Sequence, residues 1–547
     1  MSDPGTAARK LREERTLRIL TVLVLALAAA ASTRYRFRID LTEDRSFTLS
    51  PVSRSLAEEI PETVSVTYYR SAALADLHPG VRMAQDLLGE FEAYGRGRIR
   101  VSVRDPSENP GRVESLGIFP RQLQVEEGGQ ARIATVYAGV LVEYLDDFRV
   151  LPSVLEPDNL EYEIVKAVRS LASGSVPVAA LREGDGDKDP EEDYRLLRAA
   201  LVRGGYEVRS SPRGSAVEHD VSVLFLLGNA ALDPYDAFFV DRFLAGGGGV
   251  LAAVRGVRVD PDRGLEARAL GPNPVLDLLE TYGVGVRKEL VLDVSSLSVP
   301  FQARGSGGET TYRYVRYPHW VVTERGNVAV SHPAAARYSG LDLYWPGPLE
   351  LSDRPGLERT ALVKSSPKAW KQTRAFAAGP EEEALYREEE EATRGQYVLA
   401  AALSGRFPQA YEGVRLPPRP GRSDPMPGPL SREELRPGRL VVAASSDFLT
   451  DLMGMSGSEA NAFFAVSVAD WLSAGKDLPL PGAPRGSRRL RSTEDEGRRS
   501  LAIGGIYFVN ILLVPALAGL YALLRSFRRS RAERAARDRA GQAERPS

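Results

Sequence analysis

The chain has 547 residues, which is too long for one ordinary domain and predicts three or four folded units. Hydrophobic residues make up 43% of the chain and charged residues 26%, which is typical of globular protein and excludes wholesale disorder. The formal net charge is only -2, so no global basic field attracts nucleic acid, and we exclude that class of partner.

Cysteine is absent, which excludes disulfides, thiol nucleophiles and every cysteine-based metal site. The chain has 4 histidines, far apart in sequence, and no HExxH or HxH spacing that would place two of them on one metal ion. They are His78, His219, His319 and His332. We therefore predict no metal site and no cofactor.

The first apolar segment covers residues 19–32 and is flanked by arginines. As a helix it would span roughly 21 Å, less than the roughly 30 Å hydrocarbon core of a membrane. Residues 33–37 can extend it into the interface. We predict a cytoplasmic N-terminus at 1–18 and a transmembrane helix or uncleaved signal anchor at 19–37. A cleaved signal peptide with a basic leader is the alternative.

Residues 40–173 alternate between strand and helix patterns, which predicts a first α/β domain with a mixed or parallel sheet. Apolar and polar residues alternate at 64–68 and again at 99–103, as in half-buried strands. The predicted helices lie at 83–91 and 159–171, and a further apolar strand lies at 136–144.

A second α/β domain, doubly wound in character, is predicted over residues 174–294. Its strand at 221–227 is apolar at every position except Ser222, as expected for a strand buried on both faces. Asp189 followed by Pro190 is typical of a helix start, and a second helix over 234–244 ends at a run of glycines. The apolar stripe of the first helix would comprise Tyr194, Leu197, Ala200 and Leu201.

Beyond the second domain the patterns are weaker, and we predict a looser extension over 295–480 that returns to the sheet. Residues 312–320 and the acidic run 381–391 have the composition of loops or a solvated helix. Regular structure resumes with a strand at 440–448, which is followed by a helix at 460–472.

A charged linker at 481–500 leads to the second apolar segment, 501–524, which is 24 residues long, carries no charge and can span a membrane. The tail at 525–547 is rich in arginine, which predicts a cytoplasmic C-terminus and both termini on one side. Asn510 and Pro515 are easier to accommodate against a second helix than in lipid. The residues predicted to pack there are Gly504, Gly505, Asn510, Pro515 and Gly519.

Seven segments follow one another in a characteristic order between the two apolar ends. They are DLTEDRSFTLSP (40–51), IRVSVRDPSENP (99–110), NLEYEIVKAVRSLAS (159–173), FVDRFLAGGGGVLAAV (239–254), ALVKSSPKAW (361–370), LVVAASSDFL (440–449) and FFAVSVADWLSAG (463–475). With this ordered set the chain resembles the GldG family, the auxiliary proteins of an ABC-type transport system associated with gliding motility in some bacteria.

The resemblance implies an α/β chain of tandem extracytoplasmic domains with mixed or parallel sheets, flavodoxin-like or amidotransferase-like in layering, and one transmembrane helix at each end. It implies the bacterial cytoplasmic (inner) membrane as the location, with the bulk of the chain outside the cytoplasm. It also implies a separate ATPase subunit, a polytopic permease subunit and membrane lipid as partners, and no known catalytic residues. One departure is the turn from Arg182 to Gly186, which lacks the histidine of the expected Gly-His-Gly-Glu-like sequence.

Acidic residues occupy every second position of the segment 183–189. Counted from Asp185 as an EF-hand loop, Pro190 and Leu196 stand where a glycine and a glutamate are required, so that pattern fails and a helix-capping loop is favoured. Ligands of open α/β sheets gather at the carboxyl ends of strands, and these acids follow a strand. The loop residues predicted to contact a ligand or partner are Glu183, Asp185 and Asp187.

Three further motifs have a structural interpretation. The glycines at 246–249 precede a strand and are not followed by Gly-Lys-Ser/Thr, the reverse of a phosphate-binding loop. The Ser-Ser-Asp sequence at 445–447 lacks the GxSxG elbow of a hydrolase. Glu161 and Glu163 point away from each other on a helix. We predict no catalytic residues.

The sequence thus favours a non-catalytic, membrane-anchored auxiliary subunit that binds a substrate or an envelope component for an ABC-type transport complex. Two alternatives stay open at this point. One is a free-standing envelope scaffold, and the other is a hydrolase or amidotransferase that would use the flavodoxin-like layer.

Overall fold

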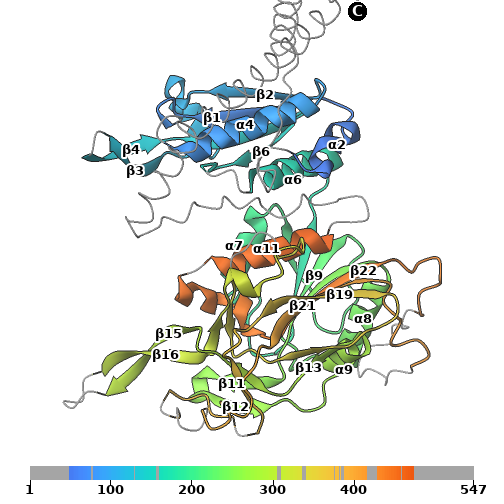
Figure 1. Ribbon diagram of the computed structural model, residues 1–547. Coiled ribbons are helices and arrows are strands. Elements are labelled where there is room, and N and C mark those ends of the chain that lie inside the picture. The colour runs from blue at the N-terminus through green and yellow to red at the C-terminus, as the bar shows by residue number, and fades with distance from the viewer. Residues whose placement is uncertain are drawn as a thin grey trace, which may run out of the picture. The chain divides into compact units, whose positions relative to one another are not determined.

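The computed structural model describes the middle of the chain (Figure 1). It covers residues 49–473 with gaps at 75–77, 128–129, 156–158, 305–309, 336–339, 375, 381, 383–386, 415–427 and 458. The two apolar segments, 19–37 and 501–524, lie outside the described residues, and so do the packing positions predicted between Gly504 and Gly519.

The flanking membrane helices of the predicted fold class are not seen, since no helix within the described ranges is both long and apolar enough to cross a membrane. Helix α4 (Pro79–Tyr94) has 16 residues but carries charges, and the apolar helix α11 (Ala460–Ser473) has only 14. At 1.5 Å per residue these helices reach roughly 24 and 21 Å. The described chain is mixed α/β throughout.

Residues 49–173 fold around a 4-stranded sheet with the strand order β2-β1-β5-β6. The strands are β1 (Val64–Arg70), β2 (Ile99–Arg104), β5 (Ala138–Tyr144) and β6 (Asp147–Leu151). Strands β1 and β2 are parallel, as the crossover through α4 requires, and the other two pairings are antiparallel. Helices α2 (Pro51–Glu59), α4 and α6 (Leu160–Ser173) pack their apolar faces against this sheet.

Sequence patterns located most of these elements. The predicted strands at 64–68, 99–103 and 136–144 and the predicted helices at 83–91 and 159–171 are confirmed as β1, β2, β5, α4 and α6. Helix α5 (Pro110–Ser115) and the hairpin of β3 (Arg121–Glu127) and β4 (Gln130–Val136) were not predicted.

Residues 177–473 fold around a 9-stranded sheet with the order β13-β18-β21-β22-β10-β9-β7-β8, in which β19 also pairs with β21. The strands are β7 (Val178–Glu183), β8 (Glu207–Ser210), β9 (Val221–Leu227), β10 (Gly249–Ala253), β13 (Val284–Val286), β18 (Leu349–Leu351), β19 (Leu357–Lys364), β21 (Val398–Gly405) and β22 (Gly438–Ala443). Strands β8, β7, β9, β10 and β22 are mutually parallel, and the pairings beyond β22 are antiparallel.

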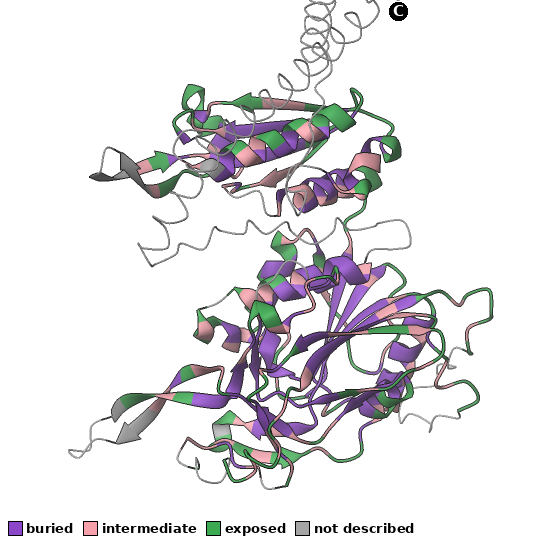
Figure 2. Ribbon diagram, in the orientation of Figure 1, coloured by how far each residue is buried: buried purple, intermediate pink, exposed green. Residues whose placement is uncertain are grey.

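Helices cover both faces of this sheet, and Figure 2 shows the buried strands between them. One face packs against α7 (Arg195–Arg203) and α11, and the other packs against α8 (Pro234–Ala245) and α9 (Pro274–Thr281). The apolar strand predicted at 221–227 is confirmed as β9, whose side chains reach both cores. The helix predicted over 234–244 is confirmed as α8, which begins with a capping box between Asp233 and Asp236.

The segment expected to be a looser extension supplies four strands of the large sheet, namely β18, β19, β21 and β22. Residues 312–320, expected to be a loop or solvated helix, lie in strand β16 (Thr310–Val322), which forms a long hairpin with β15 (Ser296–Arg304). Smaller sheets complete this region. They pair β11 (Val257–Asp260) with β12 (Glu266–Ala269), β14 (Leu290–Leu292) with β20 (Trp370–Gln372), and β16 with β17 (Asp342–Tyr344).

Candidate functional site

Four parallel strands, β7, β9, β10 and β22, end at one edge of the large sheet, because parallel strands share their carboxyl edge. Polar residues that follow these strands meet in a cluster, which we call the carboxyl-edge cluster. It comprises Glu183, Asp185, Lys188, Asn229, Arg255 and Asp447. Ligands of open α/β sheets bind at this edge, so the cluster is the first candidate for a functional site.

Arg255 is the centre of the cluster and is only 4% exposed. Its guanidinium forms ion pairs with both Asp185 and Asp447, and the distance from Nη1 to Asp447 Oδ2 is 3.1 Å. Burial alone would lower the pKa of Arg255, but attraction by the two carboxylates more than offsets burial and raises that pKa above its ordinary value. Lys188 Nζ approaches Asp447 Oδ1 at 3.5 Å. Arg255 therefore stays charged and joins the ends of β7, β10 and β22.

Backbone groups complete the network around Asp185 and Asn229. Oδ1 of Asp185 accepts hydrogen bonds from the backbone N–H groups of Asn229 and Ala230 at 3.0 and 3.1 Å. The Asn229 side chain accepts a hydrogen bond from the N–H of Arg255 at 2.9 Å and donates one to its carbonyl oxygen at 3.1 Å. These bonds satisfy polar groups that the strand ends would otherwise bury without partners.

Two glycines allow the turns after β7 and β9 to approach each other. A Cβ atom on Gly184 would lie 2.2 Å from the carbonyl oxygen of Gly228, closer than any real contact. Gly228 itself has a φ of +91°, and a Cβ there would lie 2.3 Å from the carboxyl carbon of Asp185. The close approach is what brings Asp185 under the turn that follows β9.

The structure places the three predicted contact residues in different surroundings. Glu183 and Asp185 are only 7% and 5% exposed, and Glu183 is the last residue of β7 and not a loop residue. Oε1 of Glu183 accepts the N–H groups of Asp185 and Gly186 at 2.7 and 2.6 Å, and burial raises the pKa of Glu183 against the effect of these bonds. Asp187 is more exposed and pairs with Arg258 at 2.5 Å. A ligand or partner contact by these residues stays a prediction.

Tyr194 is a buried residue beside the cluster that sequence reasoning assigned only to an apolar stripe. Its side chain is fully buried, and its hydroxyl group has no hydrogen-bond partner among the residues that the structure describes. Burial raises the pKa of Tyr194 well above its ordinary value, and the charges of Asp185 and Asp447 raise it further. No sequence signal separates such a tyrosine from an ordinary core aromatic.

The serines that follow β22 have structural partners. The Ser445 hydroxyl donates a hydrogen bond to the carbonyl oxygen of Tyr344 at 2.7 Å. The Ser446 hydroxyl donates to Asp447 Oδ2 at 3.2 Å. Each hydroxyl hydrogen is thus held by a protein acceptor, in agreement with the structural interpretation of this Ser-Ser-Asp motif.

The four histidines lie in separate places, and none of the described residues form a group of three or more metal-ligating side chains. His319 is fully buried in the core, where Nε2 lies 3.4 Å from Gln372 Oε1. The ring of His332 packs edge-on against Trp471, with ring centroids 4.8 Å apart. Burial lowers the pKa of both His319 and His332 to about 4.

These two histidines predict a pH-dependent stability. Between their ordinary pKa of 6.5 and the folded value of about 4, the unfolded chain binds protons that the folded chain does not. We therefore expect the free energy of unfolding to fall as the pH drops through this window. Denaturant titrations across the window measure the slope, and His319→Asn should make it shallower. The expectation fails if the variant keeps the slope of the parent protein.

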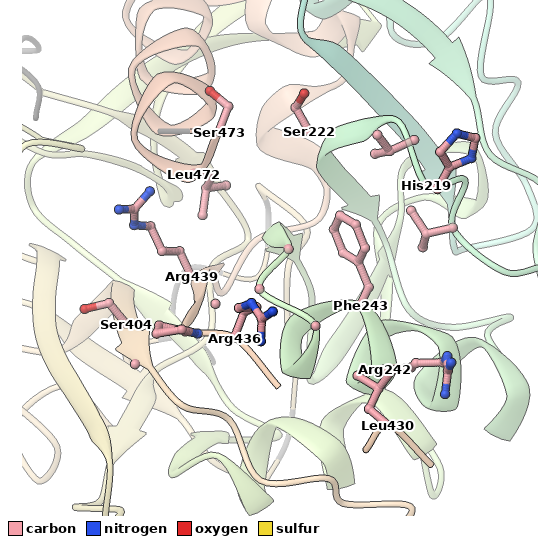
Figure 3. Close-up of a pocket in the computed structure, with 18 of the residues that line it drawn as sticks. His219, Ser222, Arg242, Phe243, Ser404, Leu430, Arg436, Arg439, Leu472 and Ser473 are labelled. Carbon is pink, nitrogen blue, oxygen red and sulfur yellow. The ribbon is translucent and has the colours of Figure 1, made fainter. Parts of the chain in front are cut away.

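A large pocket lies at the opposite, amino edge of the same sheet, where β9, β10 and β22 begin and β21 ends (Figure 3). We call it the amino-edge pocket; its volume is about 1170 Å³. Its charged or titratable lining residues are Glu218, His219, Arg242, Glu358, Arg436 and Arg439. Its larger apolar ones are Phe239, Phe243, Leu430, Trp471 and Leu472. Sequence reasoning missed this pocket because its walls come from segments far apart in the chain.

Residues 177–468 match a protein family that is described as an ABC-type uncharacterized transport system. The chain belongs to this family. Residues 43–143 match a second family, a domain of unknown function (DUF7088). Membership of this family supports the general prediction of an auxiliary component of an ABC-type transport system. It does not single out the GldG proteins.

Other comparisons place the chain beside more distant proteins. It is 21% identical over 508 residues to an "Uncharacterized protein" of Borreliella burgdorferi, covering 91% of this chain and 94% of that one. A solved ThuA-like protein from Parabacteroides merdae shares 9% identity with a TM-score of 0.28, over 56% of this chain and 98% of that one. The exo-β-1,4-mannosidase Op5Man5 from an Opitutaceae bacterium shares 9% identity with a TM-score of 0.23, over 73% of this chain and 50% of that one. These TM-scores are too low to support an argument from structure.

Proposed function

We propose that this protein is a non-catalytic auxiliary subunit of an ABC-type transport complex, of the GldG kind, that binds a substrate or an envelope component outside the bacterial cytoplasmic membrane. The match of residues 177–468 to a transport-system family is the observation that carries the proposal. The match covers the whole large sheet and reaches into α11, so it includes most of the fold that bears the two candidate sites.

The geometry of the carboxyl-edge cluster supports a binding role over catalysis. Its cations pair with Asp185 and Asp447, and the nearby Ser445 and Ser446 donate their hydroxyl hydrogens to protein acceptors. A nucleophilic serine would instead donate its hydrogen to a general base. These contacts stabilise the strand ends, and they favour the auxiliary subunit over the hydrolase or amidotransferase alternative.

The glycines that follow α8 support a separate ATPase subunit as a partner. The N–H groups of Gly246, Gly247 and Gly248 donate to carbonyl oxygens of the last turn of α8 at 3.0, 3.0 and 2.8 Å. A phosphate-binding loop instead directs such N–H groups at the nucleotide. In the proposed complex, ATP is bound by the ATPase subunit, and a polytopic permease subunit forms the passage through the lipid.

Affinity purification of the tagged protein from its native membrane tests the proposal. We expect an ATPase subunit and a permease subunit to be recovered with it in fixed proportion and identified by mass spectrometry. Recovery of the protein without either subunit would favour a free-standing envelope scaffold and overturn the proposal. Protease added to intact spheroplasts should cleave the segment 49–473, whereas protection until the cells are lysed would place this segment in the cytoplasm.

A further inference from the structure

The amino-edge pocket has more cationic than anionic groups on its lining. Arg242 projects from α8, Arg436 lies just before β22, and Arg439 lies within β22. The lining carboxylates are Glu218 and Glu358, which are both exposed. Glu218 already pairs with Arg209 outside the pocket, at 3.3 Å. Three guanidinium groups therefore face two carboxylates, of which one is engaged elsewhere.

Arg439 is the most informative of these cations because it is partly buried. Its Nη1 donates to the carbonyl oxygen of Trp471 at 3.0 Å, and its guanidinium carbon lies 5.6 Å from the centroid of the indole. No carboxylate of the described chain forms an ion pair with it, and burial lowers its pKa. Partly buried charges are normally paired with an opposite charge, so this guanidinium suits an anion in the pocket.

Arg436 lies nearer the solvent and owes its place to a glycine. A Cβ atom on Gly247 would lie 2.6 Å from the Cβ of Arg436, so the glycine leaves the room that this side chain occupies. Its Nη1 donates to backbone carbonyl oxygens at Glu433 and Leu435, which leaves other guanidinium N–H groups to face the hollow. In Figure 3 Arg436 lies between Arg439 and Arg242.

Apolar side chains share the pocket with these cations. Phe243 and Leu430 lie on one side in Figure 3, and Leu472 lies on the other. The volume of about 1170 Å³ exceeds the roughly 300–1,000 Å³ of typical small-ligand sites. An isolated inorganic anion would leave most of this space and the apolar wall unused.

From these features we propose that the amino-edge pocket binds an amphiphilic anion. Its phosphate or carboxylate head meets Arg436 and Arg439, and its apolar body lies against Phe243 and Leu430. Guanidinium groups recognise both kinds of head through paired hydrogen bonds. The head can belong to a free molecule or to a lipid. The proposal does not depend on which subunits accompany the protein, so it can fail without affecting the proposed function.

Calorimetric titration of the full-length protein with hexyl phosphate tests this site. Inorganic phosphate supplies the head alone, and hexyl glucoside supplies the apolar body with a neutral head. We expect the parent protein to bind hexyl phosphate more tightly than inorganic phosphate or hexyl glucoside. We expect Arg436→Gln and Arg439→Gln each to bind hexyl phosphate roughly tenfold more weakly than the parent protein. Arg436→Gln alters a side chain near the solvent, so its result does not depend on the packing of Arg439 against Trp471.

Arg313→Gln is the matched control, because it removes one exposed positive charge from β16, outside the pocket. We expect this control to bind hexyl phosphate as the parent protein does. Equal affinity in Arg436→Gln and the parent, or equal affinity for hexyl glucoside and hexyl phosphate, would overturn the proposal. Vesicles of phosphatidylglycerol and phosphatidylcholine distinguish the two sources of the head. If the protein binds these vesicles and the arginine variants do not, the head belongs to a lipid. If the protein binds hexyl phosphate but not the vesicles, the head belongs to a free molecule.

Discussion

Replacing Arg255 with methionine is expected to lower the free energy of unfolding by about 3–5 kcal/mol. The substitution leaves Asp185 and Asp447 without their shared cation at positions that are only 5% and 6% exposed. A buried carboxylate without a partner is costly, whereas the pair as a whole contributes much less to stability. Urea denaturation followed by tryptophan fluorescence measures the change.

Arg258→Met is the matched control for this experiment. Arg258 also pairs with an acid of the same loop, Asp187, but the two side chains are 23% and 38% exposed, so we expect a loss of at most about 1 kcal/mol. A second variant, in which Arg255→Met is combined with Asp185→Asn and Asp447→Asn, should be more stable than the single variant. Equal losses in Arg255→Met and Arg258→Met would show that the buried pairing is energetically unimportant.

Trp370→Ala is expected to destabilise the protein by a similar amount, about 3–5 kcal/mol. Trp370 is fully buried in β20 and packs in the same core as Leu251 of β10 and Phe464 of α11. Removal of the indole leaves a cavity that such a packed core cannot fill. Denaturant titration of the variant gives the loss directly.

Tyr314→Ala provides the control, because this aromatic residue is 73% exposed on the β15–β16 hairpin. We expect the control to change the free energy of unfolding by no more than about 0.5 kcal/mol. A small effect of Trp370→Ala would contradict the placement of the region beyond residue 295 in the core of the large sheet.

Sequence patterns located elements that carry a long and regular signal. The continuous apolar run of β9 and the helical spacing in α6 were each sufficient for a correct prediction. Strands β18 and β20 have three residues each, too few for any periodicity to emerge. Helix α7 begins at Arg195, five residues after the expected start at Pro190, because Asp189 caps a separate turn through the N–H groups of residues 191 and 192.

The candidate sites were predictable only in part. The acids at 183–187 stood out because they follow a strand, but their burial depends on partners that are distant in sequence. Arg255 and Asp447 are 192 residues apart, and nothing in either segment indicates that they meet. Arg255 and Asp447 meet because β22 lies beside β10 in the sheet, and the strand order depends on the whole sheet and not on either segment alone.

The position of β22 also has a consequence for how the chain reaches this fold. One edge of strand β10 pairs with β9, which precedes it closely in the chain. Its other edge pairs with β22, where Val250 lies beside Leu440, a residue made much later in synthesis. At synthesis rates of roughly 5–20 residues per second, the ribosome needs about 10–40 s to make the intervening segment. Throughout that time β10 presents unpaired backbone groups and apolar side chains, which other chains can bind. Nascent chains that have not reached residue 443 should therefore depend on chaperones and aggregate readily when truncated there.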